Sequence, residues 1–473
     1  MALMNCSSPE RLDLSSNSLY GTIPAELSSL TRLRELRVSN NSLGGSIYFL
    51  MNYTDLKLLE LGKNKFEGTI PEVIGYKLPK LQFMDLMYNQ LNGSIPKSLG
   101  NCSALRYFAV DYNNLSGAIP REFTMLTRLQ TLVLAANNFE GNIFPLLLNC
   151  TQLQFFGLAV NMFVGSIPAD IGLKLPNLQV FYAGGNQFHG VIPKSVGNCS
   201  QLSILDLSFN LLSGVVRQEL GRLTALQRLY LGSNSLSNGH CATVCVLDVL
   251  SNCSILEVLE LHGNNFSGIL SRGIGNLSPR LSKLLLGGNN ITGNIPDEIG
   301  NLTELTNFNL SDNNVIGQVP SALGHLKNLQ LLDLSSNKLQ GSIPLEFKML
   351  VNLVYLLLAL NQISGEIPSN LGSLQQLTEL QLSHNELTGR IPNAIGHCFR
   401  LLKIDLSYNS LTGNIPMEIS NLSSLAFYLN CSHNSLTGRL PSLGRMEQML
   451  WIEIPEPCRK RIWGNGANIN RAA

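Results

Sequence analysis

The sequence has no excess of charge of either sign. Its 473 residues include 33 lysines and arginines and 32 aspartates and glutamates, so the formal net charge is +1. No cluster of lysine or arginine resembles a polyphosphate site or a membrane-surface site. These observations disfavour nucleic acid as a partner.

Long apolar runs are also missing. A segment that spans a bilayer needs about 20 consecutive apolar residues, and we find none. The first ten residues have no basic flank and no apolar core long enough for a signal peptide. We therefore expect that this chain alone carries neither a membrane span nor a signal peptide.

Signatures of catalysis are equally scarce. A kinase domain needs a glycine-rich loop before a Val-Ala-x-Lys strand, a His-Arg-Asp loop and an Asp-Phe-Gly segment, and the sequence contains none of them. No nucleophile with an orienting acid can be assigned beside His262, His384 or His433. We interpret these residues as lone solvated histidines, and we predict no enzymatic activity, no cofactor and no metal.

The sequence does contain a self-similar unit of about 24 residues, repeated about eighteen times. One clean copy runs from Leu332 to Pro344 and reads LDLSSNKLQGSIP. Its leucines at 332 and 334 alternate with Asp333 and Ser335, which predicts a short strand with the leucines inside and the polar residues toward solvent. Because one strand cannot bury its own apolar face, the copies must stack and their strands must pair in parallel.

An asparagine, Asn337 in this copy, follows each strand. The turn there buries backbone N–H and C=O groups, which cost a few kcal/mol if unpaired. The asparagine amide has both a donor and an acceptor, so it can bond neighbouring coils at once. Gly341 permits a close turn, and Pro344 ends the segment. The equivalent residues are Asn17, Asn41, Asn64, Asn89, Asn113, Asn137, Asn161, Asn186, Asn210, Asn234, Asn264, Asn289, Asn313, Asn361, Asn385, Asn409 and Asn434.

The pattern L-x-L-x-x-N-x-L-x-G-x-I-P resembles the plant-type leucine-rich repeat. Its Gly-x-Ile-Pro ending is intact in eleven copies, such as Gly341 to Pro344. The resemblance covers roughly residues 3 to 441 and implies the ectodomain of a plant leucine-rich-repeat receptor-like kinase or receptor-like protein. The implied fold is an α/β solenoid, a right-handed superhelix with a parallel β-sheet on its concave face and short helical or irregular segments on its convex face.

Both ends depart from the family pattern. The residues Asn5-Cys6-Ser7 match Asn101-Cys102-Ser103, so the sequence begins in the middle of a repeat, and the family's N-terminal cap of paired cysteines and tryptophan is missing. Terminal repeats need a cap, so we expect the chain to begin inside a longer protein. We assign residues 1–441 to one leucine-rich-repeat domain and predict a disordered, non-repeat tail over 442–473.

The cysteines fall into two groups. Most occupy leucine positions of the repeat, and we interpret them as small buried apolar residues: Cys102, Cys150, Cys199, Cys253, Cys398 and Cys431. Cys241 and Cys245 lie instead in the one irregular repeat, which has about six extra residues between Asn234 and Asn264. They form either a local disulfide or two free thiols. A zinc site is disfavoured because no second ligand pair stands at the required spacing.

The irregular repeat carries a second resemblance. Its segments Ser237 to Gly239 and Leu247 to Cys253, with Gly275 to Ser278 beside it, are similar to the lengthened repeat of receptor kinases that perceive bacterial peptides. This similarity implies a signalling role, with immunity among the candidate settings.

About sixteen Asn-x-Ser/Thr sequons are present, and an asparagine-rich repeat generates them by composition alone. Their placement is more informative, because seven of them follow the Gly-x-Ile-Pro segment on the back of the coil, whereas Asn40, Asn309 and Asn430 project from the strand face. If the protein is secreted, glycans would coat the back. The predicted glycosylation sites are Asn52, Asn101, Asn149, Asn198, Asn252, Asn276, Asn301 and Asn421.

The strand face is where we expect function. Its exposed positions are the residues six, four, two and one before the marker asparagine, and in most repeats they are polar. From the fourth to the eighth repeat they become aromatic or apolar, and tyrosine and phenylalanine are frequent anchors of interfaces. The alternative is cross-strand stacking that only stabilises the sheet. The predicted ligand-binding residues are Phe83, Met87, Tyr88, Tyr107, Tyr112, Val133, Phe155, Val160 and Tyr182.

Charged residues on the same face are scattered, and we interpret them as solvated. They are Arg11, Asp13, Glu35, Arg37, Glu60, Asp85, Glu379, Lys403 and Asp405.

Three functions remain open at this point. The family resemblance favours an extracellular ligand-recognition ectodomain that binds a peptide or protein and recruits a shorter leucine-rich-repeat co-receptor kinase. Its place would be the outer face of the plasma membrane, as part of a full-length receptor. The first alternative is a secreted protein similar to plant polygalacturonase inhibitors, which have about ten repeats and both caps. The second is a non-functional fragment of a receptor.

Overall fold

The computed structural model describes residues 9–422, 424–425 and 428–440. The predictions for the tail at 442–473 and for the first residues of the chain lie outside this part. Within it, each repeat contributes one short strand to a parallel first sheet of 18 strands. Successive strands keep one register, so that Leu332 pairs with Phe308 on one side and Leu356 on the other. The strands of the first sheet are β1 (Arg11–Asp13), β3 (Glu35–Arg37), β5 (Leu58–Glu60), β7 (Phe83–Asp85), β9 (Tyr107–Ala109), β11 (Thr131–Val133), β13 (Phe155–Gly157), β15 (Val180–Tyr182), β17 (Ile204–Asp206), β19 (Arg228–Tyr230), β21 (Val258–Glu260), β23 (Lys283–Leu285), β25 (Asn307–Asn309), β27 (Leu331–Asp333), β29 (Tyr355–Leu357), β31 (Glu379–Gln381), β33 (Lys403–Asp405) and β35 (Tyr428–Asn430).

A second set of parallel strands, which was not predicted from the sequence, follows the marker asparagines. In the described residues these strands form sheets of ten, four, two and two strands. The ten-stranded sheet comprises β2 (Tyr20–Thr22), β4 (Ser42–Ser46), β6 (Lys65–Thr69), β8 (Gln90–Gly93), β10 (Asn114–Ala118), β12 (Asn138–Gly141), β14 (Met162–Ser166), β16 (Gln187–Gly190), β18 (Leu211–Val215) and β20 (Ser235–Ser237). The others comprise β22 (Ser267–Ile269), β24 (Asn290–Gly293), β26 (Asn314–Gln318) and β28 (Lys338–Gln340), then β30 (Ser364–Glu366) with β32 (Glu386–Thr388), and β34 (Thr412–Gly413) with β36 (Ser435–Leu436).

Short helices complete each coil on the side away from the first sheet. Most are single 3-10 turns that begin after a proline: Pro344, for example, has φ −62° and precedes the turn at Leu345–Met349. The α-helical turns are α1 (Ile74–Lys77), α2 (Phe144–Leu147), α3 (Ile171–Lys174) and α4 (Cys245–Leu250). The 3-10 turns are η2 (Ala25–Ser29), η3 (Ile47–Asn52), η4 (Lys97–Asn101), η5 (Arg121–Met125), η6 (Lys194–Asn198), η7 (Gln218–Arg222), η8 (Arg272–Asn276), η9 (Asp297–Asn301), η10 (Ser321–His325), η11 (Leu345–Met349), η12 (Ser369–Ser373), η13 (Asn393–His397) and η14 (Met417–Asn421).

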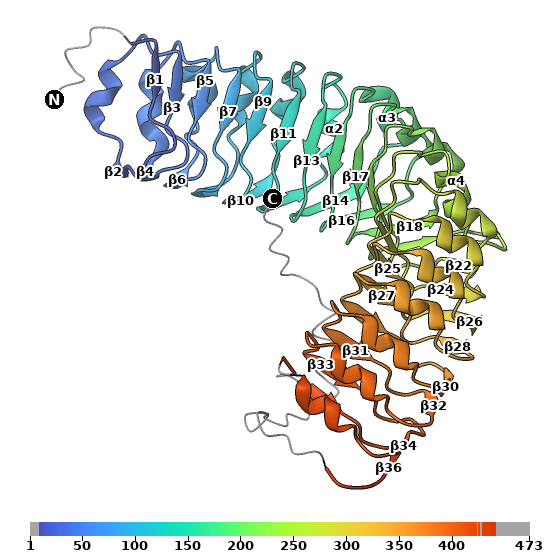
Figure 1. Cartoon of the computed structure of the whole chain (residues 1–473). Helices are drawn as coiled ribbons and strands as arrows, with labels where there is room; N and C mark the ends of the chain where they lie inside the picture. Colours follow the sequence, from blue (N-terminus) through green and yellow to red (C-terminus); the bar gives the residue numbers. More distant parts are fainter. Residues whose placement is uncertain (1–8, 423, 426–427, 441–473) are drawn as a thin grey trace.

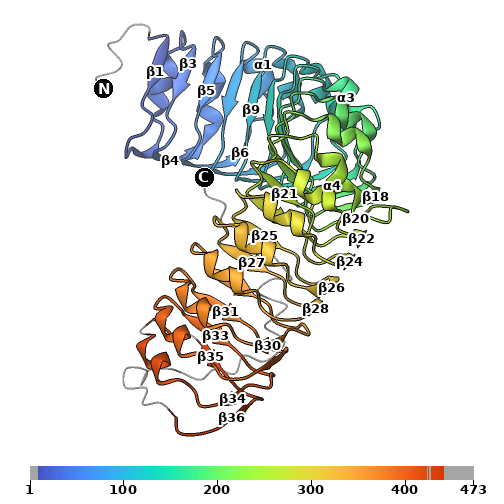
Figure 2. The same cartoon turned by 45° about the vertical axis from the view of Figure 1, so that its right-hand side comes forward.

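The coils stack side by side into one curved array, from the N-terminal coils in blue to the C-terminal coils in red (Figure 1). The view turned by 45° shows α4 near the bend and both ends of the array on the same side (Figure 2). No helix in the described residues is long and apolar enough to cross a membrane.

The repeated leucines form one continuous core. Leu332 and Leu334 are fully buried, as the alternation of the strand predicts. Five of the repeat cysteines are buried free thiols, which confirms their interpretation as core residues, whereas Cys431 is only half-buried. Burial raises the pKa of the Cys102 thiol to about 12, which keeps the thiol protonated and unreactive. Asp333, in contrast, is not left in solvent: neighbouring coils half-bury it, and its carboxylate accepts hydrogen bonds from Ser335 N and Oγ.

The asparagines form a ladder of hydrogen bonds along the array, as expected. Asn337 Nδ2 lies 2.9 Å from Leu310 O of the preceding coil and within 3.2 Å of Leu334 O and Ser335 O of its own coil. Its Oδ1 accepts a hydrogen bond from Val315 N of the preceding coil at 3.0 Å. One amide therefore pairs buried backbone groups of two coils.

The residue directly before each ladder asparagine adopts a left-handed conformation. Its φ is 54° at Ser336, 50° at Tyr88 and 53° at Tyr112. Val160 has φ 58°, which is unfavourable for a β-branched residue. This bend ends the strand and places the side chain at the rim of the concave face.

The irregular repeat interrupts the second sheet but not the first. Between β20 and β22 the Asn238 amide replaces strand pairing: its Nδ2 donates to the carbonyls of Cys241, Thr243 and Ser267, and its Oδ1 accepts from Ser267 N. A disulfide joins Cys241 and Cys245, with 6.3 Å between their Cα atoms, which decides between the two alternatives left open by the sequence.

Candidate ligand-binding face

Six of the nine predicted ligand-binding residues combine into pairs of aromatic rings across neighbouring strands. The register of β7 and β9 places Phe83 beside Tyr107, and their ring centroids lie 4.0 Å apart with the planes at 10°. Tyr88 and Tyr112 stack in the same way at 4.2 Å and 9°. Further along, Phe155 of β13 meets Tyr182 of β15 at 5.9 Å with tilted planes. The rings therefore stabilise the sheet, as the structural alternative requires.

The same rings also leave apolar surface uncovered on the concave face. Tyr88 is 43% exposed, Tyr112 is 46% exposed and Val160 is 62% exposed. The other predicted ligand-binding residues are half-buried: Phe83, Met87, Tyr107, Val133, Phe155 and Tyr182. The structure thus places all nine on one continuous stretch of the concave face, from β7 to β15 and the bends that follow these strands.

Two carboxylates belong to the same coils as the first two ring pairs: Asp85 ends β7 and Asp111 follows β9. Asp85 is 6% exposed and Asp111 is 8% exposed, so the interpretation of Asp85 as a solvated residue is wrong. Burial raises the pKa of Asp85 and raises the pKa of Asp111 to about 6, and in each case a nearby carboxylate adds to the effect. Asp111 was not among the predicted residues, although it stands where most repeats have a small residue.

The N-terminal edge of this face is charged and paired. Arg11 and Glu35 lie 3.1 Å apart, and Arg37 is 3.8 Å from both Glu35 and Glu60. The Lys63 ammonium lies 6.0 Å from the centre of the Tyr88 ring. These residues are partly exposed, in agreement with the solvated face predicted from the sequence.

The C-terminal part of the face is built differently. Asp405 is buried, contrary to expectation, and its carboxylate accepts from Ser407 N at 3.0 Å and from Ser407 Oγ at 2.6 Å. His384 and His433 are not isolated either. They stack on opposite sides of Tyr408, with centroid distances of 4.1 Å and 4.0 Å. The equal spacing of the coils brings these side chains into one column, which single repeats do not reveal.

All eight predicted glycosylation asparagines are exposed and lie at or just after the short helices. Asn101 ends η4, Asn301 ends η9, and Asn149 and Asn252 follow α2 and α4. This is the side of each coil away from the first sheet, so glycans there would leave the concave face open. The glycosylation itself stays a prediction.

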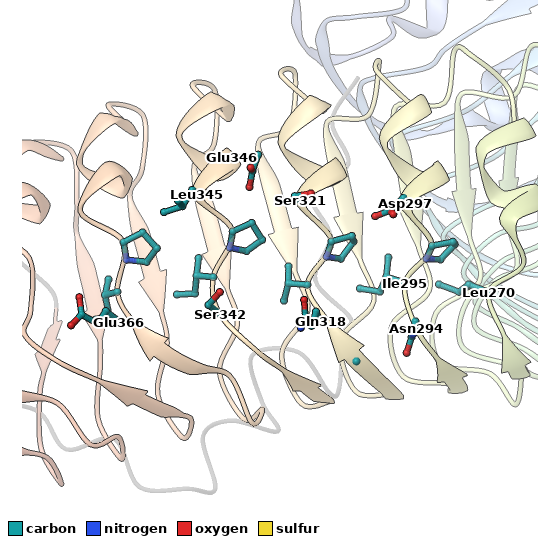
Figure 3. A pocket seen from close by; sticks show the side chains of 18 of the residues that line it. Leu270, Asn294, Ile295, Asp297, Gln318, Ser321, Ser342, Leu345, Glu346 and Glu366 are labelled. Carbon is teal, nitrogen blue, oxygen red and sulfur yellow. The ribbon is translucent and has the colours of Figure 1, made fainter.

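An open groove of about 1950 Å³ runs across the coils on the outer side, from Ile269 to Thr412. Its labelled side chains Asn294, Gln318, Ser342 and Glu366 occupy equivalent positions in successive coils (Figure 3). Each is the variable residue of a Gly-x-Ile-Pro segment or its variant. The groove is therefore a step that the repeat produces in every coil, and we assign it no ligand.

No group of three or more histidine, cysteine or acidic residues in the described part of the chain is placed to hold a metal ion.

The coils and their asparagine ladder define a leucine-rich-repeat protein. Leucine rich repeat models match residues 174–236 and nine further segments between residues 8 and 422. Among solved structures, the leucine-rich-repeat ectodomain of the membrane receptor kinase GASSHO1/SCHENGEN3 from Arabidopsis thaliana, in complex with CASPARIAN STRIP INTEGRITY FACTOR 2, is 34% identical. It matches with a TM-score of 0.79 over 92% of this chain and 54% of that one.

This chain matches a larger share of a second structure. The Arabidopsis receptor kinase HAESA, in complex with the peptide hormone IDA and the co-receptor SERK1, is 31% identical with a TM-score of 0.73, over 93% of this chain and 80% of that one. The curated relative receptor-like protein 39 from Arabidopsis thaliana is 32% identical over 103 residues, which is 21% of this chain and 12% of that protein. The chain belongs to the family of plant leucine-rich-repeat receptors and corresponds to their ectodomain.

Proposed function

We propose that this chain is the ligand-recognition part of a plant cell-surface receptor and that it binds a peptide or protein on the concave face between β7 and β15. The observation that carries the proposal is the continuous stretch of nine aromatic and apolar residues there, with Tyr88, Tyr112 and Val160 exposed. Exposed apolar surface of this kind costs free energy in water unless a partner covers it.

The relatives support this proposal. GASSHO1/SCHENGEN3 and HAESA are both described in complex with a peptide or protein factor, and HAESA also with a co-receptor. By the same reasoning we propose a shorter leucine-rich-repeat co-receptor kinase as the second partner, the outer face of the plasma membrane as the location, and signalling, with immunity as one setting, as the role. In this proposal the chain acts by binding and has no catalytic role.

The test uses the chain with a phage-displayed library of random peptides as the probe. Peptides enriched on the native chain should lose most of their binding when Tyr107→Ala and Tyr182→Ala are combined, because the two substitutions remove two aromatic rings from the predicted face. Tyr355→Ala on β29, which is 40% exposed, is the matched control and should retain binding.

Thermal unfolding of the same variants separates binding from structure. Because each substitution breaks one ring pair, the double variant should unfold at a somewhat lower temperature than the control, but the proposal requires that it still be folded at the temperature of the binding assay. If its melting temperature falls sharply while no peptide is ever enriched on the native chain, the rings serve the sheet alone and the proposal is wrong.

A further inference from the structure

The outer groove of the later coils has a counterpart in earlier coils with a different lining. In both places the residue that follows the glycine of the Gly-x-Ile-Pro segment, or of its variant, contributes to the lining. In the later coils this residue is mostly polar, as at Asn294, Gln318 and Ser342 (Figure 3). In two earlier coils it is Val191 and Val215, which line a separate groove of about 840 Å³. We call this second cavity the valine groove.

The two valines form an exposed apolar ledge along the valine groove. Val191 is 49% exposed and Val215 is half-buried. Each valine lies against a glycine of the next coil: a Cβ at Gly214 would be 2.9 Å from Val191 Cγ1, and a Cβ at Gly239 would be 2.9 Å from Val215 Cγ2. Below the ledge, buried residues of the core also line the groove: Ile167, Ile192 and Val216.

The irregular repeat supplies one end of the valine groove. Its loop and the start of α4 contribute Cys241, Cys245 and Val246 to the lining. A disulfide joins the two cysteines, and the buried Asn238 amide donates to the carbonyls of Cys241 and Thr243. These links hold the loop in place before any partner arrives, which lowers the entropy cost of binding there.

Exposed apolar side chains continue from the groove onto the second sheet. Because Leu212 is buried, the alternation along β18 places Leu211 and Val215 on the same outer face. Leu211 is 62% exposed, and the equivalent Met162 of β14, two coils earlier, is 42% exposed. The equivalent residue of β28 is Lys338. Apolar surface of this kind on one side of a solenoid is typical of contact with a protein partner.

Two cations without an ion pair stand beside the valine groove. Arg217 replaces the proline of the repeat, Lys194 follows Pro193 in the neighbouring coil, and both are exposed residues of the lining. Among the residues that the structure describes, neither takes part in a salt bridge. Glu219 is the only acid in the described part of the lining, and it is not paired with either cation. The excess of positive charge favours a carboxylate on the partner.

We propose that the valine groove and the adjoining outer face of β14 and β18 form a second docking site, which binds a partner protein through an apolar side chain followed or preceded by an acidic one. The apolar side chain lies on the valine ledge against the disulfide loop, and the carboxylate pairs with Lys194 and Arg217. None of the nine predicted ligand-binding residues belongs to this site, so the inference goes beyond the proposed function. A partner segment with lysine or arginine beside its apolar residue is disfavoured by the same two cations.

The test converts the valine groove into a polar groove with residues that the repeat already accepts. Val191→Asn and Val215→Gln introduce side chains found at the same position in later coils, and Arg217→Pro restores the proline of the repeat. Arg217 has φ −78°, which proline can adopt. The triple variant should therefore remain folded, and circular dichroism checks this. If it is unfolded, Val191→Asn alone, at an exposed position, takes its place.

A phage-displayed library of random peptides, bound to the native chain and depleted on the triple variant, is the probe. The surviving peptides should share an aspartate or glutamate beside a large apolar residue. The triple variant should weaken their binding about tenfold or more, because it removes the apolar contact and a cation together. Arg217→Pro alone should weaken it about two- to fivefold, as expected for one partly exposed ion pair. Binding should also fall as salt is raised.

Two controls place the peptides on the outer side of the coils. Ile316→Ser on β26 changes an exposed apolar residue of the same outer face in a later coil, and it should bind the peptides as the native chain does. The combined Tyr107→Ala and Tyr182→Ala variant should also retain them, because those rings lie on the concave face.

The outcomes separate the two proposals. If depletion leaves no peptide, the second site is overturned, while peptides that depend on Tyr107 and Tyr182 would keep the proposed function intact. Groove-dependent peptides that share no acid and bind Arg217→Pro normally would also overturn the inference, because the partner would lack the predicted chemistry. Acidic, groove-dependent peptides without any peptide that needs the aromatic face would support the second site and count against the proposed function.

Discussion

The two halves of the concave face use one backbone for different surfaces. Around β33, Asp405 is paired with Ser407, and the neighbouring rings of His384, Tyr408 and His433 form a closed column. Around β7 and β9, Asp85 and Asp111 lack that pairing, although the rings above them stack just as closely. The first region satisfies its own polar groups. In the second region burial raises the pKa of both carboxylates, and exposed tyrosine rings lie on the same part of the face.

The largest effect that we predict concerns the asparagine ladder, which the two regions share. Asn137→Ala in the aromatic region and Asn337→Ala in the polar region should each lower the free energy of unfolding by about 3 kcal/mol or more, since several buried backbone groups lose a partner at 1 to 3 kcal/mol each. Both amides make the same four contacts, to Val110, Leu134, Ala135 and Leu115 in the first case. Denaturant unfolding of both variants measures the two values. Clearly different losses would mean that the halves do not share one framework.

Asp111→Asn, in contrast, should raise the free energy of unfolding at neutral pH. The pKa of Asp111 is raised from 3.8 to about 6, so the folded state holds a proton that the unfolded state has lost between these pH values. A raised acid pKa makes the folded state less stable as pH rises toward 6, and the full loss persists above 6. Removing the charge should therefore raise the free energy of unfolding at pH 7.5 by about 1 to 3 kcal/mol and should change it little at pH 4.

The matched substitution in the other half sharpens this contrast. Asp405→Asn weakens the hydrogen bonds from Ser407 N and Oγ, so it should lower the free energy of unfolding at pH 7.5 by about 1 kcal/mol. Unfolding curves of both variants at the two pH values give the comparison. If Asp111→Asn also destabilises the chain at pH 7.5, the ionised carboxylate contributes to stability and the predicted cost of burying it is wrong.

The smallest effect concerns the stacked rings. Tyr112→Leu should cost about 0.5 to 1.5 kcal/mol of stability, the usual contribution of one ring pair, and Tyr408→Leu should cost more because Tyr408 stacks on two rings. Only Tyr112→Leu should also weaken binding of the selected peptides. Equal loss of binding in both variants would remove the difference between the two regions.

The structural features that depend on one repeat alone could be predicted from the sequence. The strand at Leu332 and Leu334, the ladder at Asn337, the turn at Gly341 and the buried Cys102 all follow from local periodicity and chemistry. The second sheet was missed because its pairing exists only between coils. The burial of Asp85 and Asp405 was missed for the same reason: alternation states which way a side chain points, but neighbouring coils decide how much water reaches it.

The candidate site was predicted in part. Its aromatic residues stand out against polar repeats, so Tyr88, Tyr107 and Tyr112 could be named from the sequence. Asp111 could have been found by comparing the repeats position by position, since an acid there replaces the serine or small residue found in most other copies. The stacking of His384 and His433 on Tyr408 could not have been found in that way, because it depends on the spacing between coils.

The asparagine ladder also separates folding from modification. In every copy, from Leu19 to Leu436, the residue two places after the ladder asparagine is leucine, phenylalanine, isoleucine or valine, and most of these side chains fill the core. A glycosylation sequon requires serine or threonine at that place. Because an apolar residue stands at that place, no ladder asparagine lies in a glycosylation sequon, and this holds even before the chain folds. Sequons at other positions of the repeat therefore do not involve the asparagines whose hydrogen bonds join neighbouring coils.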